Sequence, residues 1–123
     1  MIFRSVLVVD DSNTNIVLLE KLFEKNGYRV FSALSALEGI DEMNSHPPDI
    51  IYLDLLMPGV DGLEFVRMVK KNDKWKHIPV VILSAVTDSE VIRQSLELGV
   101  TEYITKPLEI ERIISLTKEI LSN

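Results

Sequence analysis

The stretch Val6-Leu7-Val8-Val9-Asp10-Asp11 joins four successive apolar residues to a pair of acids, and it decides how the rest of the chain is interpreted. An uninterrupted apolar run of this kind is typical of a strand that is covered on both faces in a parallel sheet. In open sheets of that type, ligands bind beyond the carboxyl ends of the strands. The stretch therefore predicts a buried parallel strand that delivers two carboxylates to a functional edge.

Four other short runs also favour strands, and longer segments of helical periodicity separate them. The predicted strands cover residues 6–9, 29–32, 50–53, 80–83 and 101–105. This alternation predicts an α/β protein in which five parallel strands and five helices form a three-layer sandwich. A chain of 123 residues is about the size of one domain, so we expect a single domain over residues 1–123.

Helix ends and apolar stripes refine this picture. A capping residue followed three positions later by an acid predicts a helix start, and glycine predicts a left-handed helix end. The predicted starts are Ser35 with Glu38, Asp61 with Glu64 and Thr87 with Glu90, and the predicted ends are Gly27 and Gly99. The stripes expected in the core are Ile16, Leu19 and Phe23 in the first helix, Leu37, Ile40 and Met43 in the second, and Ile110, Ile113, Ile114 and Ile120 in the last.

Composition excludes several classes of protein. A formal net charge of −6 opposes binding to nucleic acid phosphates, so we expect no direct nucleic acid binding. The basic cluster of Arg67, Lys70, Lys71, Lys74 and Lys76 is interpreted as a solvated helix face. No apolar run approaches the roughly 20 residues of a membrane helix, and the chain has no cysteine for disulfides or thiolate metal sites. We therefore expect a cytoplasmic protein that does not associate with membranes.

Polar residues follow four of the predicted strands directly. They are Asp10, Asp11 and Ser12, then Asp54, then Ser84, and finally Lys106 with Pro107. Three carboxylates at one edge repel one another and raise each other's pKa values, unless a cation joins them. With only oxygen ligands at hand, Mg²⁺ is the favoured ion. Read singly, Asp11 or Ser12 could be a helix cap and nothing more.

A lysine and a hydroxyl at this edge favour a phosphoryl group rather than a metal alone. A phosphoryl group in transfer carries negative charge on its oxygens, which a metal, an ammonium and a hydroxyl can each bind. Asp54 is then the candidate nucleophile, because an ionised carboxylate can attack phosphorus and become an acyl phosphate.

Four motifs in this order and spacing resemble the receiver domains of response regulators in bacterial two-component signalling, of the chemotaxis-regulator type, from about Ser5 to the end of the chain. The motifs are Val6-Leu7-Val8-Val9-Asp10-Asp11, Asp54-Leu55-Leu56-Met57-Pro58-Gly59-Val60-Asp61-Gly62, Leu83-Ser84-Ala85 and Tyr103-Ile104-Thr105-Lys106-Pro107. The resemblance implies a flavodoxin-like (βα)5 fold with strand order 2-1-3-4-5.

The resemblance also implies a role for each site residue. Asp54 is the phosphorylated aspartate, and Asp10, Asp11, Asp54 and the backbone carbonyl of Leu56 hold Mg²⁺, for which Mn²⁺ can substitute. Lys106 and Ser84 bind the phosphoryl oxygens, and the peptide bond from Lys106 to Pro107 is cis. Ser84 moves inward on phosphorylation, and Tyr103 follows it from an exposed toward a buried position.

The implied function is a phospho-accepting switch rather than a turnover enzyme, although the domain assists its own phosphorylation and dephosphorylation. The implied donor is a sensor histidine kinase or a histidine phosphotransfer protein. The face made by helix 4, strand 5 and helix 5 then acts on a downstream protein, on an attached output domain, or on a second copy in a phosphorylation-dependent homodimer. The sequence leaves open whether the domain stands alone or belongs to a larger regulator.

Two departures and three alternatives complete the interpretation. Leu56 and Val86 are apolar where several relatives carry polar side chains, which predicts a long-lived phosphorylated state. An aspartate-nucleophile phosphatase would usually need a second acid at position 56. A degenerate receiver that serves only for docking is a second alternative. A flavin-binding relative of the same fold is the third, but Asp10 and Asp11 would repel the flavin phosphate.

Overall fold

The computed structural model describes residues 3–56 and 62–122. Within them five parallel strands form one sheet in the order β2-β1-β3-β4-β5, so the expected fold and strand order are confirmed. The elements are β1 (Ser5–Val9), α1 (Asn13–Lys25), β2 (Arg29–Ala33), α2 (Ala36–Ser45), β3 (Ile50–Leu53), α3 (Gly62–Lys71), β4 (Val80–Ser84), α4 (Ser89–Glu97), β5 (Glu102–Thr105) and α5 (Ile110–Leu121).

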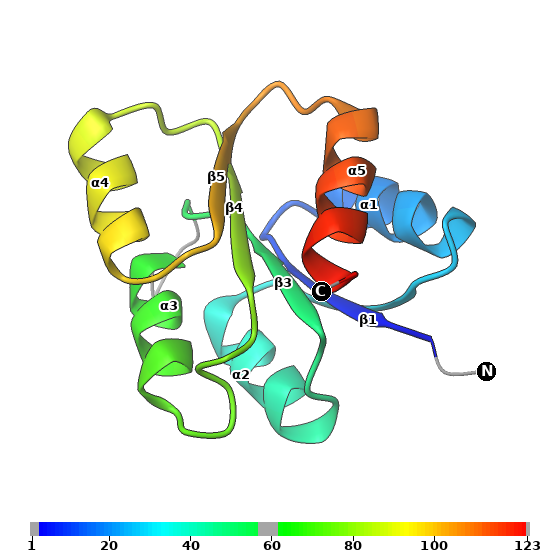
Figure 1. Ribbon diagram of the computed structural model, residues 1–123, viewed down its shortest axis with the longest axis horizontal. Coiled ribbons are helices and arrows are strands. Elements are labelled where there is room, and N and C mark those ends of the chain that lie inside the picture. Colours follow the sequence, from blue (N-terminus) through cyan, green and yellow to red (C-terminus); the bar gives the residue numbers. More distant parts are fainter. Residues whose placement is uncertain (1–2, 57–61, 123) are drawn as a thin grey trace.

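Helices cover both faces of the sheet, with α1 and α5 on one side and α2, α3 and α4 on the other (Figure 1). Successive residues of a strand point to opposite faces, so the apolar run of β1 supplies both layers of the core. Val6 and Val8 pack with α1 and α5, whereas Leu7 and Val9 pack with α2 and α3. This division explains why the strand needs apolar residues at every position.

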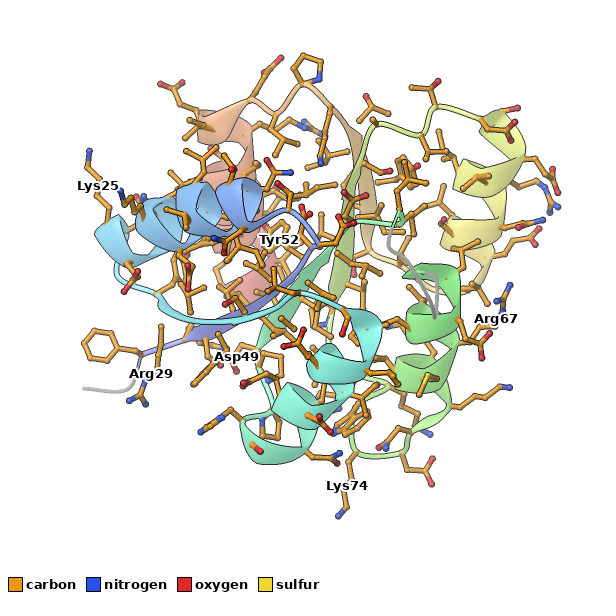
Figure 2. The ribbon with its side chains drawn as sticks, turned by 180° about the vertical axis from the view of Figure 1, so that it is seen from behind. Lys25, Arg29, Asp49, Tyr52, Arg67 and Lys74 are labelled. Atoms are coloured by element: carbon orange, nitrogen blue, oxygen red, sulfur yellow. The ribbon has the colours of Figure 1, made fainter. Side chains whose placement is uncertain are left out.

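Tyr52 of β3 connects the sheet to α5 through a hydrogen bond within the core. Its ring is fully buried in the middle of the molecule (Figure 2) and lies 5.1 Å from the ring of Phe23. Its hydroxyl makes a short hydrogen bond with the Thr117 hydroxyl of α5. Burial raises the pKa of Tyr52 to about 12, and the bond to Thr117 opposes that rise. This hydrogen bond therefore links β3, the strand that precedes Asp54, to α5.

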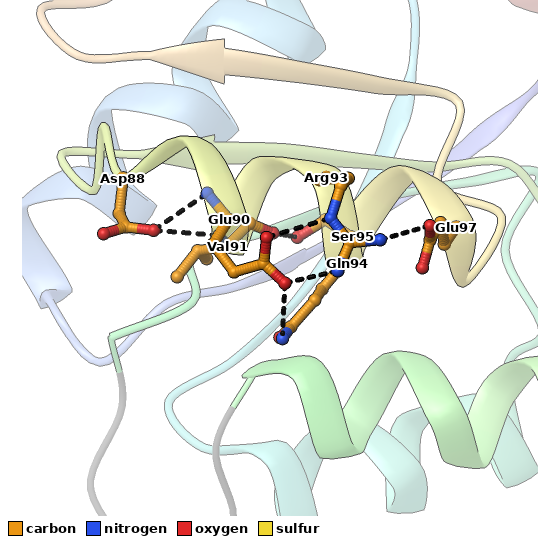
Figure 3. Close-up of polar contacts among 7 residues, drawn as sticks. All are labelled: Asp88, Glu90, Val91, Arg93, Gln94, Ser95 and Glu97. Atoms are coloured by element: carbon orange, nitrogen blue, oxygen red, sulfur yellow. Dashed lines mark hydrogen bonds and ion pairs between the residues drawn. The ribbon is translucent and has the colours of Figure 1, made fainter.

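The helix ends agree with the sequence in part. The Ser35 hydroxyl accepts a hydrogen bond from the Glu38 amide, and Gly27 and Gly99 both have positive φ, as expected. The cap predicted at Thr87 is wrong, because Asp88 caps α4 by accepting from the amides of the two residues that follow Ser89 (Figure 3). The cap predicted at Asp61 lies outside the described residues.

Two residues assigned to the core are exposed instead. The side chains of Leu37 and Ile110 are 62% and 46% exposed. In α2 the buried positions are Ala36, Gly39 and Met43, which recur every three to four residues and leave the neighbouring Leu37 off the packed stripe. The way each helix packs on the sheet decides which of its residues are buried, and Leu37 and Ile110 lie outside the buried sets of α2 and α5.

The basic cluster is mostly a solvated surface. Arg67 and Lys74 point away from the body of the molecule (Figure 2). Lys70 differs, because its ammonium donates to the carbonyl oxygens of Lys76 and Ile78 at 3.3 Å and burial lowers its pKa. Lys70 therefore stabilises the loop before β4. Among the described residues, no helix has both the length and the apolar character needed to cross a bilayer.

Candidate functional site

The central strands β1 and β3 lie side by side and bring the predicted acids together. Val9 pairs with Leu53, and the Asp54 amide donates to the Val9 carbonyl at 3.0 Å. Asp10 and Asp54 consequently leave the sheet at the same edge. Asp10, Asp11 and Asp54 each place a carboxylate oxygen within 4.8 Å of the other two.

Burial differs among the three acids. Asp10 and Asp54 are 5% and 8% exposed, whereas Asp11 is exposed to solvent. Burial is the main reason why the pKa of Asp10 is raised, and the negative charge of Asp54 raises it further. Hydrogen bonds from the Ser12 amide and the Asn15 side chain, together with the charge of Lys106, lower that pKa in part. Desolvation, more than the mutual repulsion expected from sequence, governs this carboxyl group.

Lys106 brings a cation into the same cluster from the end of β5. Its ammonium lies 3.2 Å from Asp54 Oδ2 and 4.0 Å from Asp10 Oδ2. The Lys106 amide donates to the Ser84 carbonyl at 2.9 Å, and the peptide bond to Pro107 is cis. When ionised, three carboxylates and one ammonium carry a net charge of −2, which a single divalent cation neutralises.

The donor set fits a hard divalent ion. All three side chains offer carboxylate oxygens, the ligand type that Mg²⁺ and Mn²⁺ prefer. Three carboxylate oxygens within 4.8 Å of one another could reach one small ion after small side-chain movements. The Leu56 amide donates to Asp54 Oδ1 at 3.1 Å, and the Leu56 side chain is 59% exposed. The acidic cluster can therefore hold a metal ion.

Ser84 and Tyr103 are joined through one intervening residue, Val86. The buried Ser84 hydroxyl accepts from the Val86 amide at 3.2 Å, and the Tyr103 hydroxyl donates to the Val86 carbonyl at 2.6 Å. The Tyr103 ring is half-buried against the core, and its hydroxyl is held at the loop after β4. Burial raises the pKa of Tyr103.

Two residues near the acids have roles that the motifs did not specify. The Ser12 hydroxyl accepts from the Asn15 amide and caps α1, which was one of the alternatives for Ser12. The Asn15 side chain donates to Asp10 at 3.2 Å, a contact that the sequence analysis missed. The available signal was its place on the first helical turn after the acid pair. Residues 57–61 of the second motif lie outside the described residues.

Comparison with known proteins identifies the family. The sequence matches the response regulator receiver domain over residues 6–118. The chain belongs to the receiver domain family of response regulators. This receiver domain is 36% identical over 123 residues to the polar-differentiation response regulators DivK of Brucella anthropi and Brucella ovis, and each alignment covers 98% of both chains.

Solved structures agree with this assignment. A putative response regulator from Chloroflexus aurantiacus shares 30% identity with a TM-score of 0.92, covering 99% of this receiver domain and 100% of that chain. The chemotaxis protein CheY4 of Vibrio cholerae shares 26% identity with a TM-score of 0.91, covering 97% and 99% of the two chains. The receiver domain is therefore a signalling protein, and the flavin-binding alternative is set aside.

Proposed function

We propose that this receiver domain is a phosphorylation switch in which Asp54 accepts a phosphoryl group in a Mg²⁺-dependent reaction. The observation that carries the proposal is the position of the Lys106 ammonium, 3.2 Å from Asp54 inside a cluster of three acids. An ammonium at this point adds nothing to metal binding. It suits the negative oxygens of a phosphoryl group that arrives at Asp54.

In the proposed reaction, the donor is a phosphohistidine of a sensor kinase or of a phosphotransfer protein. A carboxylate oxygen of Asp54 forms a bond to phosphorus while the bond from phosphorus to the histidine nitrogen breaks, and the imidazole leaves with the bonding electrons. Lys106 and the Ser84 hydroxyl each bind a phosphoryl oxygen. Asp10, Asp11, Asp54 and the Leu56 carbonyl would hold Mg²⁺, with Mn²⁺ as a substitute, and the ion supplies neutralising charge.

The proposed output is a change in the face made by α4, β5 and α5. An inward movement of Ser84 would break its bond with the Val86 amide and disturb the Val86 carbonyl that holds Tyr103. Helix α4 buries only Ser95 fully among its residues, so little packing resists its displacement. The partner of this face is a downstream protein, an attached output domain or a second copy. The homodimer, the single domain over residues 1–123 and the cytoplasmic location remain predictions.

The direct test is incubation with Mg²⁺ and acetyl phosphate, followed by intact mass measurement. We expect one added phosphoryl group on the wild type and none on Asp54→Asn. Asp41→Asn is the matched control, because Asp41 is exposed on α2, and it should label like the wild type. Removal of Mg²⁺ with a chelator should abolish labelling. An unlabelled wild type, or equal labelling of Asp54→Asn, would contradict the proposal.

Labelling together with an assay of phosphate ester hydrolysis separates the remaining alternatives. A phosphatase would hydrolyse a phosphate ester through many turnovers, whereas the switch labels once and then stalls. Position 56 argues against the phosphatase, since its side chain is an exposed leucine rather than an acid. A domain used only for docking would stay unlabelled with every donor.

A further inference from the structure

Asn15 contacts Asp10, the most deeply buried of the three candidate metal ligands. It lies on the first turn of α1, and its side-chain amide donates to Asp10 Oδ2 at 3.2 Å. The Ser12 amide donates to the other oxygen of Asp10 at 2.8 Å. One short segment therefore supplies a donor to each oxygen of this carboxylate and fixes the plane in which it lies.

We infer that Asn15 is a positioning residue that orients Asp10 for divalent metal binding, an inference that rests on the proposed function. A carboxylate oxygen has two lone pairs, so Asp10 Oδ2 can accept from Asn15 and still bind an ion. The amide is neutral, so it orients the oxygen without the charge repulsion that a cation such as Lys106 exerts on an incoming ion. Hydrogen-bond partners of metal ligands typically contribute about 10–100-fold to metal affinity.

The N-terminal cap of α1 does not depend on the Asn15 side chain. Ser12 already caps the helix, and in the described part of the chain the Asn15 side chain makes a single hydrogen bond, to Asp10. Asn15 also lines a groove of about 240 Å³ between α1 and the segment after β5, beside Leu18, Leu19 and Leu22. A leucine of similar size at position 15 can rest on these apolar neighbours, so Asn15→Leu removes the donor without requiring a new cavity.

Titration calorimetry with MgCl₂ tests the inference on the full chain. We expect the Kd for Mg²⁺ to rise about tenfold in Asn15→Leu, at the lower end of the range for such partners. Asn15→Ala should show the same rise, and Asn15→Gln, which keeps the amide, should recover part of the affinity. The matched control is Asn13→Leu on the same turn, where the side chain is exposed, and its Kd should stay within twofold of wild type.

Labelling by acetyl phosphate at several Mg²⁺ concentrations gives a second readout. The Asn15→Leu variant should need about tenfold more Mg²⁺ for half-maximal rate and should reach the wild-type rate at saturation. Urea unfolding confirms that Asn15→Leu and Asn15→Ala fold. If the wild type binds Mg²⁺ and labels while Asn15→Leu and Asn15→Ala keep the wild-type Kd for Mg²⁺, the inference is overturned and the proposed function stands. A lower maximal rate with an unchanged Kd also overturns it, and a wild type that neither binds nor labels overturns both.

Discussion

Gly62 begins α3 directly against the backbone that follows Asp54, and replacing it with alanine should disturb both the fold and the site. The Gly62 amide donates to the Leu55 carbonyl at 3.2 Å. A Cβ atom at this position would lie 2.6 Å from Leu55 Cα, 2.9 Å from Leu55 Cδ2 and 3.0 Å from the Asp54 carbonyl oxygen. Two of these three atoms belong to the main chain, so a side-chain rotation cannot relieve the contact.

The size of the effect follows from these distances. Carbon atoms pack at about 3.5–4.0 Å, so the backbone at Leu55 must move by roughly 1 Å. Overpacking of this kind costs about 1–3 kcal/mol, and the better helix propensity of alanine returns at most about 1 kcal/mol. We expect a net loss of about 1–2 kcal/mol in the free energy of unfolding. A displacement of this size next to a reacting group can slow a reaction by about 100-fold, so labelling at Asp54 should slow by roughly 10–100-fold.

Urea unfolding and acetyl phosphate labelling measure the two effects separately. The matched control is Gly39→Ala in α2, where the three atoms nearest to the new Cβ would be side-chain atoms of Phe65 and Val9, the nearest at 2.9 Å. Gly39→Ala should lose stability through core overpacking but label at the wild-type rate. If Gly62→Ala unfolds and labels like the wild type, the argument from backbone contact is refuted.

Three other predictions concern the core, a helix cap and the lifetime of the phosphorylated state. Burial raises the pKa of Tyr52 from 10.0 to about 12. The neutral Tyr52 hydroxyl therefore contributes up to about 2.7 kcal/mol to the free energy of unfolding below pH 10, and this contribution is lost as pH rises to 12. In urea unfolding at pH 7 and pH 11, Tyr52→Phe should lose about 0.5–1.5 kcal/mol at pH 7 and show a weaker alkaline loss; an unchanged pH dependence would contradict this. Asp88→Ala should lower stability by about 0.5–2 kcal/mol, whereas Thr87→Ala should change it by less than about 0.5 kcal/mol; the reverse order would restore the cap predicted from sequence. Leu56→Asn should speed the loss of the phosphoryl group from labelled Asp54, because a polar side chain can position an attacking water, and equal or slower loss by intact mass would refute this reasoning.

The sequence by itself determined the strands and the acids that follow them. The apolar run Val6 to Val9 favours a strand that is buried on both faces, which is typical of a parallel sheet with helices on both sides. Parallel strands end at one edge, so Asp10 and Asp54 were expected at the same edge once both were placed directly after strands, and the pairing of β1 with β3 makes them neighbours. These predictions succeeded because they depend on local periodicity and on the direction of the strands alone.

Only the tertiary structure decided the choices between chemically similar neighbours. Thr87 and Asp88 can both cap a helix, and the path of the chain out of β4 places Asp88 at the cap. The exposure of Leu37 depends on how α2 is rotated against the sheet, which periodicity fixes only to within about one residue. The contact from Asn15 to Asp10 and the contact from Lys106 to Asp54 depend on side-chain directions across separate elements. Such contacts are set by packing, because the energy of each is realised only when the whole sheet edge has formed.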